Sequence, residues 1–128
     1  MTLLLDTCVF LWWITDSELL SATARKTIET SNSTIFLSTA SIWEMVIKTK
    51  LGKLELPKNP QLFISEQLEK NQIQPLSITY QHALKLYELA PLHQDPFDRI
   101  LIAQALHEQY TLVTPDSHIQ KYKVPWIW

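Results

Sequence analysis

The chain has 128 residues and a formal net charge of −2, with 46% hydrophobic and 19% charged residues. These values are typical of one compact domain with its own core, which we place over residues 1–128. The single glycine excludes glycine-rich phosphate loops, and the single cysteine, Cys8, excludes an internal disulfide and is expected to be a core thiol. No apolar run is long enough to cross a membrane, and the first residues lack the basic segment of a secretion signal, so we expect a cytoplasmic protein.

Short apolar runs and amphipathic stretches alternate along the chain. The run over residues 34–37 predicts a strand, and a helix capped by Ser38 or Ser41 should follow it and stop at Gly52. Pro75 interrupts a later run, so that strand should lie at an edge of the sheet or begin near the proline. In order, we predict strands over residues 3–5, 34–37, 73–78 and 111–114, a last strand or packed tail over 124–128, and helices over residues 9–14, 21–30, 42–51, 60–71, 80–90, 96–106 and 116–121.

The alternation predicts a parallel sheet with helices on both faces, a three-layer α/β/α fold. No repeat, low-complexity tract or break in composition indicates a second domain. In an open parallel sheet, the carboxyl ends of the strands and the starts of the following helices share one edge, and ligands bind there.

The helix that begins at Pro96 is apolar on nearly every side. Asp95 precedes it as a natural N-cap, and proline suits the first helical position. Asp98 nevertheless lies in its first turn among apolar residues. A buried carboxylate needs a partner, and a metal ion is the partner we expect here.

Four acids are predicted to meet at the ligand-binding edge. Asp6 follows the first strand and Asp116 follows the strand over residues 111–114, while Glu44 and Asp98 are placed in the first turns of helices that follow loops. Without counterions these carboxylates would repel one another and some of their pKa values would rise. Mg²⁺ or Mn²⁺ would relieve this, because hard cations choose oxygen ligands.

Each acid also has an ordinary structural explanation. Ser41 and Glu44 have the spacing of a capping box, and Asp98 is favoured by the helix dipole. Asp6 could cap the next helix, and Asp116 could belong to a Pro-Asp turn. Taken together on one edge, the four favour a site, whereas the N-cap role remains the better interpretation of Asp95.

Carboxylates with a bound metal are typical of phosphodiester hydrolysis, since the ion can activate water and stabilise the leaving oxygen. The histidines are scattered, without zinc spacing, and none is assigned to this site. Setting the four acids aside changes the net charge from −2 to +2, so the acidic balance does not exclude a nucleic acid as substrate.

The chain resembles the PIN domain family, and in particular the VapC-type toxins of prokaryotic toxin–antitoxin pairs. The resemblance rests on an ordered set of motifs that spans the chain. These are LLLDTCVFLWW near the start, SxxSIWEMVIKTKLGKLELP from Ser38, and HQDPFDRILIAQA followed by TLVTPD. The resemblance implies a PIN-like fold and Mg²⁺- or Mn²⁺-dependent endoribonuclease cleavage of RNA. It places the catalytic and metal-binding acids on Asp6, Glu44, Asp98 and Asp116, and it implies a homodimer inhibited by a VapB-type antitoxin.

Further residues carry weaker expectations. Thr7, Ser41 and Thr114 could hydrogen-bond the acids or their waters, although capping and strand roles explain them equally well. Arg99 could contact the RNA backbone or pair with a neighbouring acid. Lys48, with its neighbours Lys50 and Lys53, could follow phosphates, or Lys48 could simply form a helix pair with Glu44.

Two alternative functions remain open. The substrate could be DNA, which parallel assays on single-stranded RNA and DNA would distinguish. The protein could instead be a catalytically inactive, PIN-like interaction module, for which binding of a divalent metal is not expected.

Overall fold

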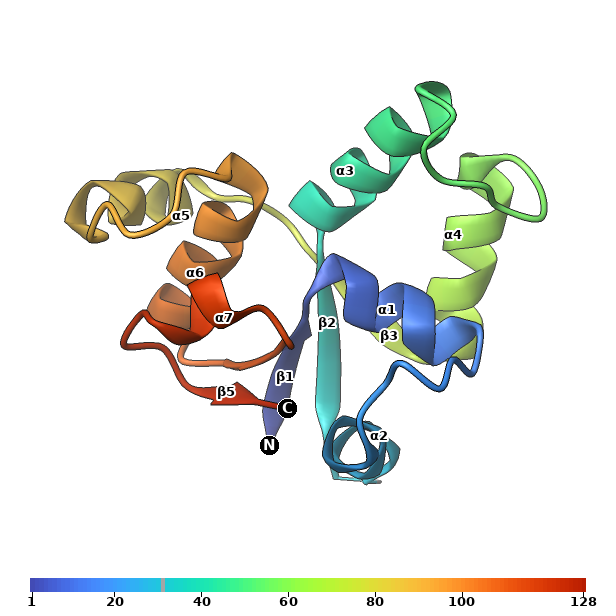
Figure 1. Ribbon diagram of the computed structural model, residues 1–128, viewed down its shortest axis with the longest axis horizontal. Helices are drawn as coiled ribbons and strands as arrows, with labels where there is room; N and C mark the ends of the chain where they lie inside the picture. Colours follow the sequence, from blue (N-terminus) through green and yellow to red (C-terminus); the bar gives the residue numbers. More distant parts are fainter. Residues whose placement is uncertain (31) are drawn as a thin grey trace.

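A computed structural model describes residues 1–30 and 32–128 (Figure 1). Five strands form one parallel sheet in the order β3-β2-β1-β4-β5. The strands are β1 (Thr2–Leu5), β2 (Thr34–Ser38), β3 (Ile73–Leu76), β4 (Thr111–Val113) and β5 (Trp126–Ile127). The helices are α1 (Thr7–Ile14), α2 (Ala22–Glu29), α3 (Thr39–Lys50), α4 (Pro60–Lys70), α5 (Tyr80–Lys85), the short 3₁₀ helix η1 (Leu86–Glu88), α6 (Pro96–Glu108) and α7 (Ser117–Gln120).

The central strand β1 supplies side chains to a core on each face of the sheet. Leu3 and Leu5 pack into the cluster under α1, α2 and α4, whereas Leu4 packs with Leu101 and Ile102 of α6. This follows from the alternation of side chains along a strand. Figure 1 shows α5, α6 and α7 on one side of the sheet and α1, α2 and α4 on the other. The predicted three-layer α/β/α fold is therefore confirmed.

Several local predictions are confirmed as well. Gly52 has a φ of 74° just after α3, in the left-handed region that suits glycine at a helix end. Pro75 lies in β3, which pairs only with β2 among the described residues and so forms an edge of the sheet. Asp95 caps α6, because its Oδ1 accepts the backbone N–H groups of Phe97 and Asp98. Within the described residues, no helix has the length and apolar character needed to span a bilayer.

The prediction that Glu44 lies in the first turn of α3 is wrong. Ser38 is the N-cap, and its Oγ accepts the Ala40 N–H at 3.0 Å. The helix therefore begins one turn earlier than a Ser41 cap would require, so Ser41 and Glu44 form no capping box and Glu44 lies in the second turn. The strand β2 runs directly into α3, which leaves no loop in which Ser41 could act as a cap.

Candidate metal centre

The four predicted acids line one pocket of about 550 Å³. It lies at the carboxyl edge of the sheet, outside β1 and β4, where α1, α3 and α6 begin (Figure 1). Asp6 and Asp116 follow these two strands, and Glu44 and Asp98 reach the same space from α3 and α6. The predicted convergence of the four side chains is thus found, even though Glu44 arrives from a second helical turn.

Asp6 is held by two threonines that were candidates for such a role. The side chain of Asp6 is buried, and its Oδ1 accepts the Thr7 backbone N–H at 2.7 Å. Its Oδ2 accepts the hydroxyl of the buried Thr114 at 2.7 Å. Both carboxylate oxygens are therefore fixed in direction by groups from α1 and from the end of β4, which organises the carboxylate without neutralising it.

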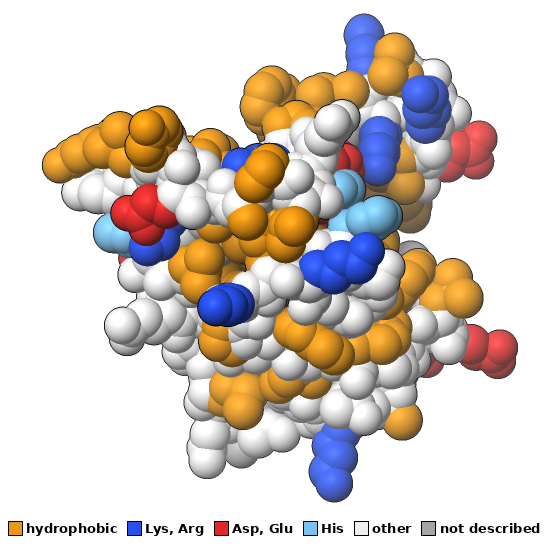
Figure 2. Space-filling view, turned by 60° about the vertical axis from the view of Figure 1, so that its left-hand side comes forward, with side chains coloured by type: hydrophobic (Ala, Val, Ile, Leu, Met, Phe, Trp, Pro, Cys, Tyr) orange, Lys and Arg blue, Asp and Glu red, His pale blue; other side chains and the backbone are white. Residues whose placement is uncertain are grey.

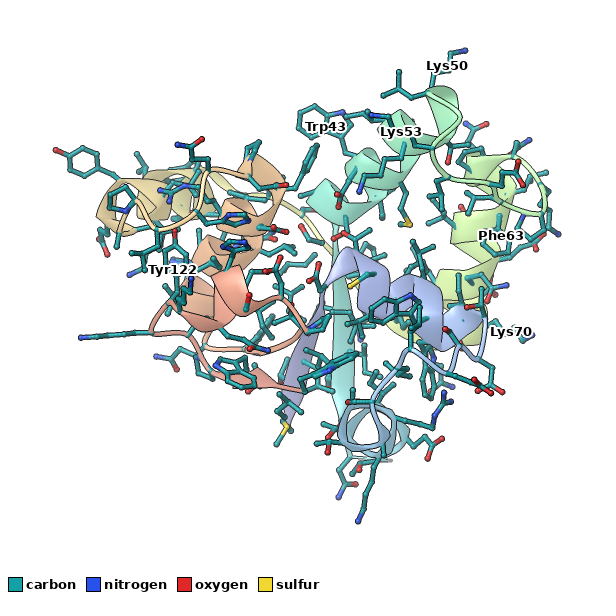
Figure 3. The ribbon with its side chains drawn as sticks, in the orientation of Figure 1. Trp43, Lys50, Lys53, Phe63, Lys70 and Tyr122 are labelled. Atoms are coloured by element: carbon teal, nitrogen blue, oxygen red, sulfur yellow. The ribbon has the colours of Figure 1, made fainter. Side chains whose placement is uncertain are left out.

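Glu44 is connected to Asp6 through Thr7. The Thr7 hydroxyl donates to Glu44 Oε1 at 2.7 Å, while the Thr7 N–H binds Asp6. The other oxygen, Glu44 Oε2, forms an ion pair with Lys48 at 2.9 Å, one turn further along α3. Lys48 and Lys53 both line the pocket, and Figure 3 shows Lys53 over α3 and Lys50 at its outer end. The helix-pair interpretation of Lys48 is therefore correct for this structure.

Asp98 has a partner that sequence analysis did not identify. His93 Nε2 lies 2.8 Å from Asp98 Oδ2, and both side chains are 17% exposed. No histidine was assigned to the site from the sequence, and the contact of His93 with Asp98 corrects this. The signal was weak, because His93 belongs to the loop before α6 and has no periodic relation to Asp98.

A second imidazole, that of His118, lies beside His93 on the side of the pocket formed by Asp98 and Asp116. Asp116 Oδ1 accepts the His118 N–H as the cap of α7, and the His118 ring stacks on His93 with centroids 4.7 Å apart and planes 4° apart. One nitrogen of His93 and one oxygen each of Asp98 and Asp116 all lie within 4.8 Å of one another. This flank of the pocket is the part where potential ligand atoms are most closely gathered.

Two of the four acids, Asp6 and Asp98, have raised pKa values, and burial is the main cause. Burial raises the pKa of Asp98 to about 6, with further increases from the charges of Asp6, Asp95 and Asp116, against a decrease from the His93 hydrogen bond. Burial also raises the pKa of Asp6, although hydrogen bonds from Thr114 and Thr7 oppose the change. Asp6 forms no ion pair among the described residues, and its burial beside three further carboxylates favours a bound cation.

Two candidate residues do not contact the acids. The Ser41 hydroxyl is buried within α3 and has no hydrogen-bond partner among the described residues. Arg99 pairs with no acid there; its Nη1 instead donates to the carbonyls of Ala90 and His93 and to Tyr122 Oη. Arg99 therefore fixes the loop that carries His93, a role that its sequence neighbours did not indicate.

The donor set fits a hard divalent cation. Carboxylate oxygens from Asp6, Glu44, Asp98 and Asp116 face one half-open space, and the structure offers no buried thiolate there, because burial and the charge of Asp6 raise the pKa of Cys8 to about 12. Oxygen ligands of this kind suit Mg²⁺ and Mn²⁺.

A comparison with protein families gives one match that covers most of the chain. The model of the family described as PIN domain matches residues 3–125. No curated protein sequence matches the chain.

Solved structures of similar fold include a toxin–antitoxin complex from Klebsiella pneumoniae, which is 15% identical with a TM-score of 0.63, over 98% of this chain and 95% of that one. VapBC2 from Rickettsia felis, bound to a DNA fragment from its promoter, is 17% identical with a TM-score of 0.75, over 99% of this chain and 98% of that one. VapBC-1 from nontypeable Haemophilus influenzae is 17% identical with a TM-score of 0.67, over 99% and 97%. FitAcB from Neisseria gonorrhoeae is 16% identical with a TM-score of 0.63, over 98% and 96%. At these identities the likeness shows a shared fold.

Proposed function

The chain belongs to the PIN domain family, and from this premise we propose that it is a metal-dependent endoribonuclease and the toxin of a toxin–antitoxin pair. The observation that carries the proposal is the pocket into which Asp6, Glu44, Asp98 and Asp116 all project. Asp6 and Asp116 also cap helices, but capping does not require four carboxylates to share one half-buried space, where they repel one another.

In the proposed reaction, Asp6, Glu44, Asp98 and Asp116 hold Mg²⁺ or Mn²⁺. When bound, the ion would lower the pKa of an attacking water and would stabilise charge on the phosphodiester. Thr7 and Thr114 keep the Asp6 carboxylate in one orientation, and Thr7 aligns Glu44 with it. Lys48 and Lys53 at the pocket supply positive charge for the phosphates of the RNA.

We assign the inhibiting partner by analogy. The toxin–antitoxin complex among the similar solved structures supports a VapB-type antitoxin as the partner of this chain, and we place the pair in the cytoplasm. Exposed hydrophobic side chains are available for a protein partner and for the proposed homodimer (Figure 2). Five of them belong to α3, α5 and η1: Trp43, Val46, Tyr80, Leu84 and Tyr87.

The direct test is cleavage of a labelled single-stranded RNA by the purified protein with Mg²⁺ or Mn²⁺. We expect cleavage that EDTA stops and that Asp6→Asn and Asp98→Asn abolish. Asp16→Asn is the matched control, because Asp16 is an exposed acid whose only described ion pair is with Arg25. Equal cleavage by Asp98→Asn and the wild type would refute the assignment.

Two further assays separate the alternative functions. A single-stranded DNA of the same sequence should be cut much more slowly than the RNA; faster cleavage of the DNA would identify a DNA nuclease instead. Mn²⁺ should raise the melting temperature, because an ion that binds only the folded state stabilises it. No rise at millimolar Mn²⁺ would favour an inactive interaction module.

A further inference from the structure

The flank formed by His93, Asp98 and Asp116 is spaced for a single ion. Ligands at bond lengths of about 2.1 Å lie roughly 3 Å apart when adjacent and about 4 Å apart when opposite, for octahedral geometry. The three donor atoms all lie within 4.8 Å of one another, and His93 Nε2 is 2.8 Å from Asp98 Oδ2. Small side-chain adjustments would bring the nitrogen and the two oxygens around one cation.

Hydrogen bonds fix the backbone segment that carries the His93 ring. The His93 N–H donates to Tyr122 Oη at 3.0 Å, and the His93 carbonyl accepts from Arg99 Nη1 at 3.3 Å. Arg99 and Tyr122 bind each other at 3.0 Å, so three segments of chain are tied at one point; Figure 3 shows Tyr122 beside α6 and α7. On its face the ring rests against His118. A ring fixed in this way reaches a ligand position at little cost in conformational entropy.

The proton on His93 is free to change nitrogens. The Nε2–H group donates to Asp98 while no ion is bound, and a metal ion would need the Nε2 lone pair. Among the described residues Nδ1 has no hydrogen-bond partner, and the side chain reaches solvent, so the proton can reside on Nδ1 instead. The neutral imidazole then keeps its proton count and presents Nε2 to the cation.

His82, in contrast to His93, already uses Nδ1 as a hydrogen-bond acceptor. His82, His107 and Glu108 also bring ligand atoms within 4.8 Å of one another. His82 Nδ1, however, accepts the Thr79 backbone N–H at 3.0 Å, so in the neutral ring the proton stays on Nε2. Its Nε2 therefore offers no lone pair without loss of the α5 cap, and this second group is not a metal site.

We propose that His93 supplies a nitrogen ligand to the divalent ion that Asp98 and Asp116 bind, and that the centre therefore prefers Mn²⁺ to Mg²⁺. This inference rests on the proposed function, because it concerns the same pocket. Imidazole is a better ligand for transition-metal ions than for Mg²⁺, which favours oxygen and retains its waters.

The test is pulsed electron spin resonance of Mn²⁺ bound to the full-length protein. Nitrogen bound directly to Mn²⁺ modulates the spin echo, and oxygen ligands do not. We expect nitrogen modulation in the wild type, a changed pattern when the histidines carry ¹⁵N, and its loss in His93→Gln. His118→Gln is the matched control, because it removes the stacked ring but keeps the backbone N–H that binds Asp116.

Each outcome decides the proposal. Wild-type protein that binds Mn²⁺ without nitrogen modulation would show an oxygen-only centre, and modulation that survives in His93→Gln would place the nitrogen elsewhere; either result overturns the role of His93 while leaving the nuclease proposal intact. Failure of the wild type to bind Mn²⁺ at all would overturn both. If His93→Gln does not fold, the ¹⁵N comparison on wild type and His118→Gln identifies the ligand.

Metal selectivity gives a second readout that does not depend on activity. Equilibrium dialysis should show that His93→Gln weakens Mn²⁺ binding by about 10-fold or more, on the scale found for changes around metal ligands. Mg²⁺ binding should change by less than about threefold, since an oxygen or water ligand satisfies Mg²⁺ equally well. Equal weakening of both ions would mean that His93 only orients Asp98, and would contradict the proposal.

Discussion

At each end of α6, a carboxylate of this helix lies beside a histidine from another segment, and the two contacts have different consequences. At the N-terminal end, His93 contacts Asp98 at 2.8 Å, and Asp6, Glu44 and Asp116 line the same pocket as Asp98. At the C-terminal end, His82 Nε2 lies 3.6 Å from Glu108 Oε2, and the His82 ring is fully buried and caps α5. The residue types alone do not distinguish a metal centre from a structural contact. The hydrogen bonds already made by the imidazole do, together with the charges that converge from other elements.

The largest expected difference between the two ends is in activity. Asp98→Asn should reduce RNA cleavage by more than about 100-fold, because even the loss of a hydrogen bond to a metal ligand costs about 10–100-fold. Glu108→Gln makes the same chemical change at the other end of the helix and should leave cleavage within about twofold. Measured rates at saturating Mn²⁺ check both. A large loss of RNA cleavage in Glu108→Gln would mean that the C-terminal end of α6 also contributes to activity.

The C-terminal end should matter for stability instead. His82→Ala should lower the free energy of unfolding by about 2–4 kcal/mol, because it removes a cap and leaves a cavity. His82→Gln should recover part of this loss, since glutamine at the same position can accept the Thr79 N–H in a capping box. Urea denaturation of the three proteins measures the effect. If the alanine and glutamine variants are equally destabilised, the hydrogen bond to Thr79 contributes little.

The N-terminal end should show an unusual pH dependence of stability in the absence of metal. The pKa of Asp98 is raised from 3.8 to about 6 in the folded state, so the folded protein holds this proton more tightly than the unfolded chain. Stability from this group is therefore present below about pH 4 and is lost as the pH rises towards 6, by on the order of 1–3 kcal/mol.

Denaturation in EDTA between pH 4 and 7 measures this loss as the difference between wild type and Asp98→Asn. Glu108→Gln should follow the wild type. A wild-type curve that rises with pH relative to Asp98→Asn would have the opposite sign and would show that Asp98 is stabilised as a carboxylate.

The reactivity of Cys8 reports on the same pocket. Burial and the charges of Asp6 and Asp116 raise its pKa to about 12, so the thiolate is scarce at neutral pH. Alkylation by iodoacetamide at pH 7.5 should be at least about 100-fold slower in the folded protein than in urea. A folded rate close to the unfolded one would show that the pocket is more hydrated than the structure indicates.

The sequence was sufficient to predict the fold and the meeting of four acids at one edge of the sheet, because both depend on short-range patterns and on topology. The alternation of Leu3, Leu4 and Leu5 between two cores follows from strand geometry, and Asp6 follows the strand. Once the sheet is parallel, the ends of β1 and β4 must lie at one edge.

The remaining features of the site depend on contacts between distant segments. His93 points at Asp98 because Arg99 and Tyr122 fix its loop, and Tyr122 is 29 residues away from His93. The start of α3 stayed open in the sequence because Ser38 and Ser41 are both plausible caps, and only the direct passage of β2 into the helix selects Ser38. Neither feature leaves a periodic signal in the sequence.

The most direct measurement for the account as a whole is anomalous diffraction from a crystal of the wild-type protein grown with Mn²⁺. The account predicts a manganese peak inside the pocket, within about 2.0–2.4 Å of carboxylate oxygens from at least two of Asp6, Glu44, Asp98 and Asp116. A crystal at millimolar Mn²⁺ with no peak in this pocket, or with manganese bound only at other acids, would contradict it.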